Sequence, residues 1–203
     1  MSARTLRRAY TLLAPLYDLA LESVSRKPRR ESLARLDPAR DRDVLICGAG
    51  SGLDLPHLPP CRSVTALDLT PAMLRRARER ARRLGRGPSF VIGDATALPF
   101  ADASFDAMVL HLILAVVPRP DLALAETQRV LRPGGRALVM DKFLRPGERA
   151  FVRRFASLFI GPLLTRTDVV FEDALAAAPA LRVTEDRPLL LGGWFRLITL
   201  AKS

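Results

Sequence analysis

Cysteine, histidine and long apolar runs are scarce in this chain of 203 residues. The two cysteines, Cys47 and Cys61, are too few for a disulfide framework. Cys47 ends a short apolar run, so we expect a packed thiol there and not a reactive one. No group of histidine, cysteine and carboxylate residues has the spacing of metal ligands, so no metal site is predicted. The sequence therefore excludes the disulfide-rich and zinc-finger classes of protein.

The longest apolar run, residues 107–118, is interrupted by His111 and is too short to span a bilayer. The N-terminus, MSARTLRRAYTLLAPLYD, carries charges and a proline where a signal peptide would need a continuous apolar core. We therefore expect a cytoplasmic protein. Peripheral attachment to the inner face of the membrane stays open as an alternative.

Lysine is also scarce, with only Lys27, Lys142 and Lys202, so arginine carries nearly all of the positive charge behind the formal net charge of +11. A basic excess suits nucleic acid, an anionic membrane surface or acidic substrates, and solvated helix faces explain it equally well. Six arginines crowd the helix predicted over residues 71–84, but they form no recognisable nucleic-acid motif, so nucleic acid is disfavoured as a partner.

The stretch that organises the chain is DVLICGAGSGLDLP, residues 43–56. Residues 44–47 form a short apolar run between a charged residue and a glycine, which is typical of a strand buried on both faces of a parallel sheet. Gly48, Gly50 and Gly52 follow at alternate positions, where the lack of a Cβ lets the backbone approach a ligand closely. We expect a helix over residues 52–58, whose N-terminal N–H groups would suit an anionic group.

A carboxylate follows the next strand at the distance that a nucleoside-binding site requires. Asp68 ends the apolar run of residues 64–67, about 20 positions beyond the first glycine. At the tip of the second strand it is placed to hydrogen-bond a ribose diol. The glycine loop and this carboxylate together favour a cofactor that contains a nucleoside.

Strands and helices alternate along the rest of the chain. The helix over 71–84 is entered through Thr70 as N-cap and is closed by Gly85. The other predicted helices are residues 4–24, 28–36, 120–131, 147–160 and 171–178, and the predicted strands are residues 43–47, 63–67, 89–92, 105–111, 136–143, 181–189 and 194–201. This order predicts an α/β fold with a doubly wound, mostly parallel, seven-stranded sheet whose last strand is antiparallel and lies beside the strand over 136–143. Ligands bind such a sheet at the carboxyl ends of its strands.

Three stretches in order then resemble the class I S-adenosylmethionine-dependent methyltransferases: VLICGAGSGLDLP, VTALDLTPAMLRRARERA and the long run from FVIGDATALPF to ALVMDKF. They cover residues 43–143, about half of the chain. The N-terminal AYTLLAPLYDLALE resembles the entry helix of the branch of small bacterial enzymes. Residues 48–56, VVPRP and the closing GGWFRLITLAK look most like bacterial phosphatidylethanolamine N-methyltransferases, and the quinone C-methyltransferases are a near second.

The resemblance implies a single Rossmann-like methyltransferase domain over residues 1–203. It would comprise an N-terminal helical lid (1–40), a cofactor-binding core (43–143), and C-terminal helices and closing strands (144–203). The cofactor would be S-adenosyl-L-methionine. The residues that the resemblance assigns to cofactor binding are Tyr10, Tyr17, Gly48, Ala49, Gly50, Gly52, Asp68, Leu69, Met73, Asp94, Ala95 and His111.

Among these residues, Asp68 would bind the ribose hydroxyls, Leu69 and Met73 would pack on the adenine, and Asp94 would accept from its amino group. His111 would line the methyl-transfer cavity, and Tyr10 and Tyr17 would come from the lid, where an aromatic ring can face a sulfonium favourably. The candidate catalytic residues are His111, Tyr17 and Asp141. Each also has a plain structural interpretation, as a buried histidine, a core aromatic or a loop carboxylate.

The chain departs from the family pattern at one position. Related enzymes usually carry Asp or Glu two residues before the first glycine, where this chain has Ile46. The acid normally helps to hold the charged methionine part of the cofactor, and Asp54 or Asp18 could compensate for its loss.

The sequence thus predicts a methyltransferase that acts on a lipid or lipophilic acceptor, such as the amine of phosphatidylethanolamine. The alternatives are a soluble methyltransferase of a small metabolite or quinone, and a binding protein of the same fold that has lost turnover. A small-molecule or lipid substrate and an anionic membrane surface are the expected partners, and the oligomeric state is left open.

Overall fold

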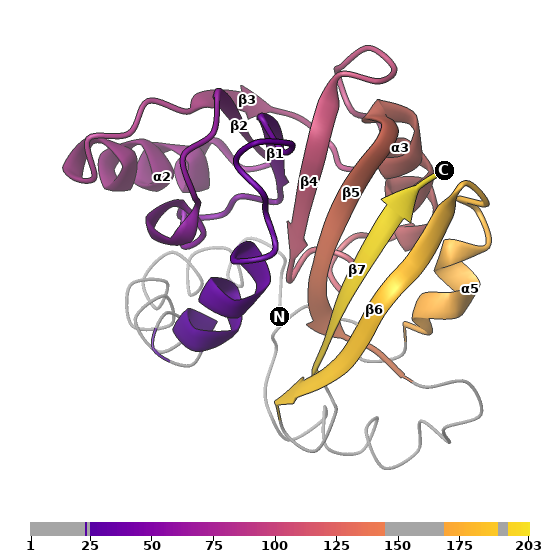
Figure 1. The fold of residues 1–203 in the computed structure, drawn as a ribbon. Coiled ribbons are helices and arrows are strands. Elements are labelled where there is room, and N and C mark those ends of the chain that lie inside the picture. The colour runs from indigo at the N-terminus through magenta and orange to yellow at the C-terminus, as the bar shows by residue number, and fades with distance from the viewer. Residues whose placement is uncertain (1–22, 24, 145–168, 191–194) are drawn as a thin grey trace, which may run out of the picture.

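Seven strands form one sheet in the order β3-β2-β1-β4-β5-β7-β6 (Figure 1). The computed structural model describes residues 23, 25–144, 169–190 and 195–203. The strands are β1 (Asp43–Cys47), β2 (Ser63–Asp68), β3 (Ser89–Ile92), β4 (Phe105–His111), β5 (Leu131–Lys142), β6 (Leu181–Leu190) and β7 (Phe195–Lys202). The helical elements are residues 25–33, η1 (Leu55–His57), α2 (Pro71–Arg83), α3 (Pro120–Val130) and α5 (Phe171–Leu175).

The sheet is mostly parallel, as predicted. β1 pairs in parallel with both β2 and β4, and the parallel pairing extends to β3 on one side and β5 on the other. β7 is antiparallel to β5 and also to β6, so it is the one strand that reverses the direction of the sheet. All five residues of β1 are buried, which explains the continuous apolar run in this central strand.

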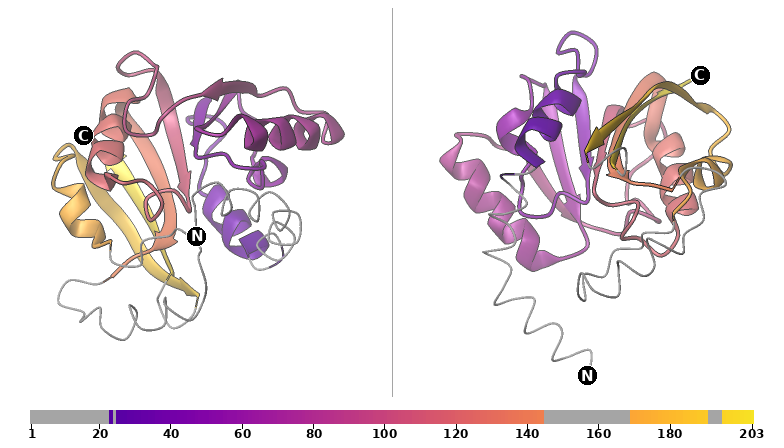
Figure 2. Two further views of the ribbon diagram at one scale, coloured as in Figure 1. Left: turned by 180° about the vertical axis from the view of Figure 1, so that it is seen from behind. Right: turned by 90° about the horizontal axis from the view of Figure 1, so that it is seen from below.

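Helices cover both faces of the sheet, as the two further views show (Figure 2). One apolar cluster joins Leu33 of helix 25–33, Leu55 of η1 and Ala81 of α2 to the residues of β1 that face them. A second cluster joins Leu124 of α3 and Phe171 of α5 to the opposite face. The two layers are the doubly wound arrangement that the alternating sequence predicts.

Helix α2 shows why its boundaries could be predicted. Pro71 occupies the first turn, and Leu74, Ala77 and Ala81 lie on one buried face. Its C-terminal end is closed by Gly85 with φ +63°, where the Arg86 N–H donates to the Ala81 carbonyl at 3.0 Å. Thr70 occupies the N-cap position without a side-chain hydrogen bond, so the predicted cap contributes no hydrogen bond here.

Four local predictions are wrong. The helix expected over 171–178 is α5, which ends at Leu175. The helix expected over 52–58 is only the 3-10 turn Leu55–His57, because prolines at 56 and 59–60 remove the N–H groups that a longer helix needs. The helix expected over 28–36 is already formed at residues 25–27 and ends at 33. The strand expected over 136–143 begins at Leu131, and residues 132–135 form an irregularity against Phe105–Ala107.

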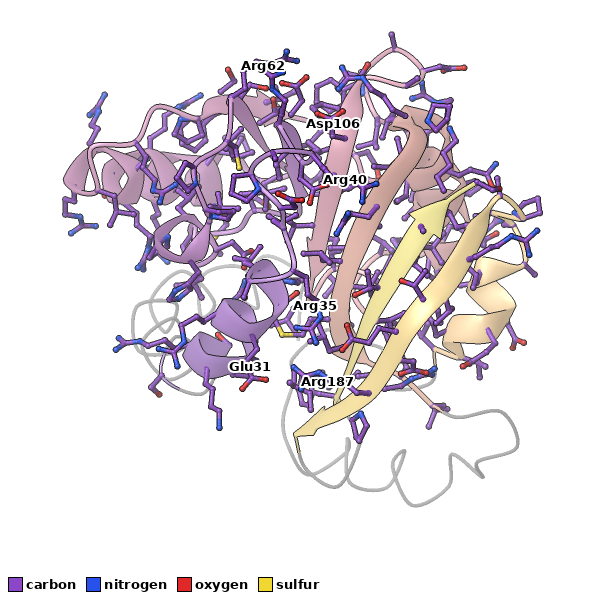
Figure 3. All side chains as sticks on the ribbon, viewed as in Figure 1. Glu31, Arg35, Arg40, Arg62, Asp106 and Arg187 are labelled. Carbon is purple, nitrogen blue, oxygen red and sulfur yellow. The ribbon has the colours of Figure 1, made fainter. Side chains whose placement is uncertain are left out.

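Helix 25–33 is attached to the far edge of the sheet by charged side chains (Figure 3). Arg35, just beyond the helix, pairs with Glu185 of β6, and Nη2 of Arg187 lies 2.8 Å from Oε2 of Glu31. These ion pairs fix the helix over the carboxyl end of the sheet, where its buried side chains meet the loops after β1 and β4. The helices predicted over 4–24 and 147–160 lie outside the described residues.

Candidate active site

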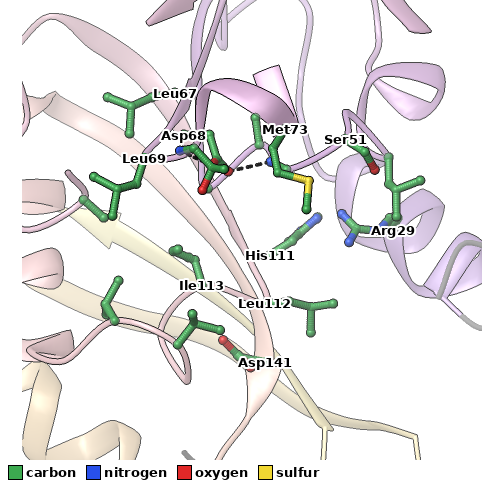
Figure 4. Close-up of a pocket in the computed structure, with 18 of the residues that line it drawn as sticks. Arg29, Ser51, Leu67, Asp68, Leu69, Met73, His111, Leu112, Ile113 and Asp141 are labelled. Atoms are coloured by element: carbon green, nitrogen blue, oxygen red, sulfur yellow. Dashed lines mark hydrogen bonds between the residues drawn. The ribbon is translucent and has the colours of Figure 1, made fainter. Parts of the chain in front are cut away.

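A cavity of about 460 Å³ lies at the carboxyl ends of β1, β2, β4 and β5 (Figure 4). This is the end at which an open α/β sheet binds ligands, and the volume is in the range of small-molecule sites. Among the residues that line it are Arg29, Gly48, Ala49, Gly50, Ser51, Asp68, Leu69, Met73, Ala95, His111, Leu112, Ile113, Val116 and Asp141.

Asp68 holds the glycine loop in place. Its Oδ2 accepts from the Gly50 N–H at 2.8 Å, and its Oδ1 accepts from the Thr70 N–H at 2.8 Å. The Ala49 N–H donates to the Leu67 carbonyl at 2.9 Å, so the loop is also tied to the end of β2 by its backbone. A ligand that reaches Asp68 therefore also meets the backbone of the loop.

The three glycines have different surroundings. A Cβ added at Gly50, where φ is +53°, would point into open space on the cavity side, so a ligand can approach the backbone here. A Cβ at Gly48 would lie 2.8 Å from Cδ1 of Ile113. Gly52 does not line the cavity, because it packs against Leu55 and Ala77 of α2. Gly48 and Gly50 are thus the members of the motif that can face a ligand.

The end of the cavity that we expect to hold the adenine is apolar. Leu69 is 66% exposed at its mouth, Met73 is half-buried beside it, and Ala95 is buried. Asp94 is exposed and does not line the cavity; its Oδ1 accepts from the N–H and the hydroxyl of Thr96, both at 2.8 Å. These hydrogen bonds lower the pKa of Asp94. Its contact with an adenine amino group stays a prediction.

A buried polar cluster formed by Arg29, Asp54, His111 and Ser32 lies at the other end. Oδ1 of Asp54 accepts from Nη1 of Arg29 at 2.6 Å and lies 2.7 Å from Nδ1 of His111. Nε2 of His111 lies 2.8 Å from the Ser32 hydroxyl. Burial opposes ionisation of Asp54, but the charges and hydrogen bonds of Arg29 and His111 hold its pKa well below the usual range. Asp54 is therefore ionised, and His111 donates to it from Nδ1.

The order Asp54, His111, Ser32 is that of a hydrolase triad, yet the geometry excludes this chemistry. Ser32 is completely buried in the helix, so its hydroxyl cannot reach a substrate. Both ring nitrogens of His111 are engaged, and His111 would have to give up one of these hydrogen bonds to act as a base. His111 lines the cavity, and in this arrangement it orients neighbouring groups and has no free nitrogen to accept a proton.

Asp141 lies at the end of β5 and also lines the cavity. It is buried, and its oxygens accept from the Ala115 N–H at 2.9 Å and the Lys142 N–H at 2.8 Å. Burial raises the pKa of Asp141 to about 6, although the backbone hydrogen bonds oppose the shift. At neutral pH Asp141 is therefore an ionised carboxylate that lines the cavity, and it can accept a proton from a ligand there.

Sequence analysis missed Arg29 as a member of the site. The signal was present, because Arg29 shares a helical face with Ser25, Ser32 and Leu33, and an arginine on a buried face needs a partner. Tyr10, Tyr17 and Asp18 lie outside the described residues.

In the described part of the chain, no group of three or more His, Cys, Asp or Glu side chains is arranged to hold a metal ion. No helix among the described residues has the length and apolarity needed to cross a bilayer. The cavity suits a nucleoside that carries a charged amino-acid tail: it has a carboxylate at Asp68, an open backbone at Gly50, an apolar wall at Leu69 and charged groups around Arg29.

Comparison with known proteins agrees with this geometry. Residues 45–139 match the family model described as a methyltransferase domain. The chain is 34% identical over 201 residues to a phosphatidylethanolamine N-methyltransferase of Cereibacter sphaeroides, covering 98% of each chain. It is 37% identical over 139 residues to a demethylmenaquinone methyltransferase of Renibacterium salmoninarum, covering 66% of this chain and 56% of that enzyme.

A solved structure of a geranyl diphosphate methyltransferase in complex with S-adenosylmethionine has the same fold. Its TM-score is 0.67 at 18% identity, and the match covers 91% of this chain and 86% of that one. The similarity to the Cereibacter enzyme over nearly the whole of both chains shows the family. The chain therefore belongs to the S-adenosyl-L-methionine-dependent methyltransferases, and S-adenosyl-L-methionine is its cofactor.

Proposed function

We propose that this enzyme methylates the amine of a lipid, with phosphatidylethanolamine as the favoured acceptor. The observation that carries the proposal is the extent of the match to the phosphatidylethanolamine N-methyltransferase, which covers 98% of both chains. The chain spans only 56% of the length of the demethylmenaquinone methyltransferase. Because the match runs nearly from end to end, it includes the N-terminal and C-terminal parts of the chain as well as the cofactor-binding core.

The cofactor, when bound, supplies a methyl group that is activated by its positive sulfur. The protein's main contribution to a direct displacement is the alignment of the acceptor with that methyl group. In our proposal Leu112, Ile113 and Val116 form the apolar wall beside the acceptor, and Tyr10 and Tyr17 close the site from the N-terminal lid. His111 joins Asp54 to Ser32 of helix 25–33 beside this wall.

Asp141 has a specific place in this proposal. A lipid amine is an ammonium at neutral pH and must lose a proton before its lone pair can attack. A carboxylate whose pKa is about 6 is ionised at pH 7 and can accept that proton. Once the amine is neutral, no stronger base is needed.

The same carboxylate supports a second candidate function, the C-methylation of a quinone precursor. A carbon acceptor of the quinol type becomes nucleophilic when its hydroxyl group is deprotonated, and Asp141 is the ionisable carboxylate that lines the cavity close to Ala115 and Lys142. The lower coverage of the quinone methyltransferase makes this the second choice. Methylation of a soluble metabolite, or binding without turnover, would follow if both lipophilic acceptors failed.

The test uses the full chain and S-adenosylmethionine labelled in its methyl group. Phosphatidylethanolamine in mixed micelles, a demethylmenaquinone analogue and detergent alone are incubated in parallel, and the lipids are separated by chromatography. We expect label in monomethyl- and dimethyl-phosphatidylethanolamine. Label only in the quinone would establish the second candidate. Cofactor binding without any methyl transfer would favour a binding protein of the same fold that has lost turnover.

We also propose that the enzyme meets its acceptor at an anionic membrane surface. The net charge is +11, and the exposed face of α2 carries Arg75, Arg82 and Arg83 beside a single acidic residue, Glu79. A basic face of this kind is attracted to anionic headgroups and would bring the cavity to the lipid.

A further inference from the structure

The missing acid before the glycine loop raises a question about the charged tail of the cofactor. Ile46 occupies the position of that acid, and it is 1% exposed among Leu33, Leu36 and Leu55 on the helix-covered face of β1. It does not line the cavity. The tail, which carries both an ammonium and a carboxylate, must therefore be held by another group in this chain.

Arg29 is placed to do this. Its side chain is 7% exposed and lines the cavity beside His111 and Ser51, away from Leu69, as Figure 4 shows. Nε donates to the Ser25 hydroxyl at 3.1 Å and Nη1 donates to Asp54 at 2.6 Å. Nη2 has no acceptor within the parts of the chain that the structure describes.

The surroundings hold this guanidinium rigidly before any ligand arrives. Asp54 compensates the charge of Arg29, and its own orientation is fixed by the second hydrogen bond to His111. A rigid guanidinium with a free terminal N–H binds a carboxylate strongly, because the hydrogen bond is charge-assisted and no side-chain entropy remains to be lost. Asp54 is buried behind Arg29 and is not one of the lining residues, so this end of the cavity presents the positive partner of the pair.

We infer that Arg29 binds the carboxylate of the methionine part of S-adenosyl-L-methionine. The cofactor would then be anchored through its carboxylate, in place of the anchoring through its ammonium that an acid at position 46 provides. With Asp68 and the Gly50 backbone toward the ribose and Leu69 toward the adenine, as the family resemblance implies, the tail of the cofactor would extend toward Arg29 at the opposite end of the cavity. The inference depends on the cofactor and is independent of the acceptor.

Binding calorimetry with two ligands tests the inference without relying on turnover. The ligands are S-adenosylhomocysteine and its decarboxylated analogue, which lacks only the carboxylate. We expect the wild-type protein to prefer S-adenosylhomocysteine by tenfold or more, and Arg29→Gln to reduce this preference to threefold or less. Arg29→Lys should keep part of the preference, because an ammonium retains the charge without the planar fork.

Arg30→Gln is the matched control, since Arg30 lies next in the same helix and is exposed. It should leave both affinities and their ratio unchanged. The ratio also separates a ligand contact from a purely structural role, because a distorted site would weaken both ligands equally. If Arg29→Gln fails to fold with Asp54 left uncompensated, the pair Arg29→Gln and Asp54→Asn removes both charges and should show the same loss of preference.

Two results would overturn the inference. The first is a wild-type protein that binds the two ligands equally, and the second is a preference that survives in Arg29→Gln. If the surviving preference came with a raised KM for phosphatidylethanolamine, Arg29 would be placed at the acceptor's phosphate. Failure of lipid methylation alone would refute the proposed acceptor and leave Arg29 unaffected.

Discussion

Replacing Ile46 by glutamate restores the acid that related methyltransferases carry, and we predict that the restored acid destabilises this protein and does not tighten cofactor binding. The Ile46 side chain is 1% exposed, within the cluster that joins β1 to Leu33, Leu36 and Leu55. A carboxylate placed there would lie among aliphatic side chains, and no hydrogen-bond donor belongs to that cluster. The variant therefore either buries a charge or keeps the carboxyl group protonated.

The cost follows from these two alternatives. Keeping a glutamate of ordinary pKa protonated at pH 7 costs about 3.7 kcal/mol. Losing the burial of the isoleucine side chain adds about 1.5–3 kcal/mol, part of which the methylene groups of glutamate recover. The expected loss of about 4–6 kcal/mol is a large fraction of the 5–15 kcal/mol that stabilises a typical domain.

Urea unfolding followed by circular dichroism measures the loss, with Ile46→Val as the matched control at about 1 kcal/mol. The pH dependence adds a second readout. A carboxyl group whose pKa is raised in the folded state favours folding below its unfolded pKa and loses this contribution as pH rises, so the variant should regain about 2.7 kcal/mol relative to the wild type between pH 7 and pH 5. A variant as stable as the wild type that binds S-adenosylhomocysteine more tightly would refute the reasoning, because the new side chain would then face the cavity.

The remaining predictions concern the cavity and the surface. Asp68→Ala should weaken S-adenosylhomocysteine binding at least tenfold in calorimetry, since a charged acceptor for the ribose and the anchor of the Gly50 N–H are both lost, at about 1.5–3 kcal/mol. The pKa of Asp141 is raised from 3.8 to about 6, so its contribution to stability is present below pH 4 and is lost as pH rises through 6; in urea unfolding the wild type should therefore lose about 2.4 kcal/mol relative to Asp141→Asn between pH 4 and pH 7. Sedimentation should show binding to phosphatidylglycerol vesicles at low salt, less at high salt and little to phosphatidylcholine. Deletion of residues 1–9, which include Arg4, Arg7 and Arg8, should reduce this binding, and indifference to anionic vesicles at low salt would argue against a lipid surface.

Most of the sheet could be predicted from the sequence because its central strands are buried on both faces. Six of the seven residues of β4 are buried, and its central residues 107–110 form a continuous apolar run, which has few other interpretations between turn residues. The predicted bounds of β3 and β4 agree with the structure. The start of β5 was wrong because Pro133, Gly134 and Gly135 indicate a turn, whereas the chain absorbs them as an irregularity within the strand pairing.

The site was predictable where local sequence determines it and not where distant segments meet. The positions of Gly50 and Asp68 follow from a strand, a turn and the next strand, and the structure joins them by a hydrogen bond. The contact between Asp54 and Arg29 spans 25 positions, and that between Ser32 and His111 spans 79. No local pattern encodes such pairings.

The loss of the acid and the presence of Arg29 have a common physical logic. An acid at position 46 would be buried against helix 25–33, and a buried carboxylate is tolerated only with a partner. In this chain the buried ion pair is Arg29 with Asp54, and Arg29 is the member that lines the cavity. Position 46 is therefore free to be apolar, and Ile46 belongs to the same cluster as Leu33 and Leu36. Related enzymes use that acid for the ammonium of the tail, whereas Arg29 in this chain attracts the carboxylate of the tail. The helix that carries Arg29 is held against β6 by two ion pairs, Arg35 with Glu185 and Glu31 with Arg187. None of these four residues lines the cavity, yet salt that weakens the two ion pairs should loosen the cofactor site, because Arg29 belongs to the same helix.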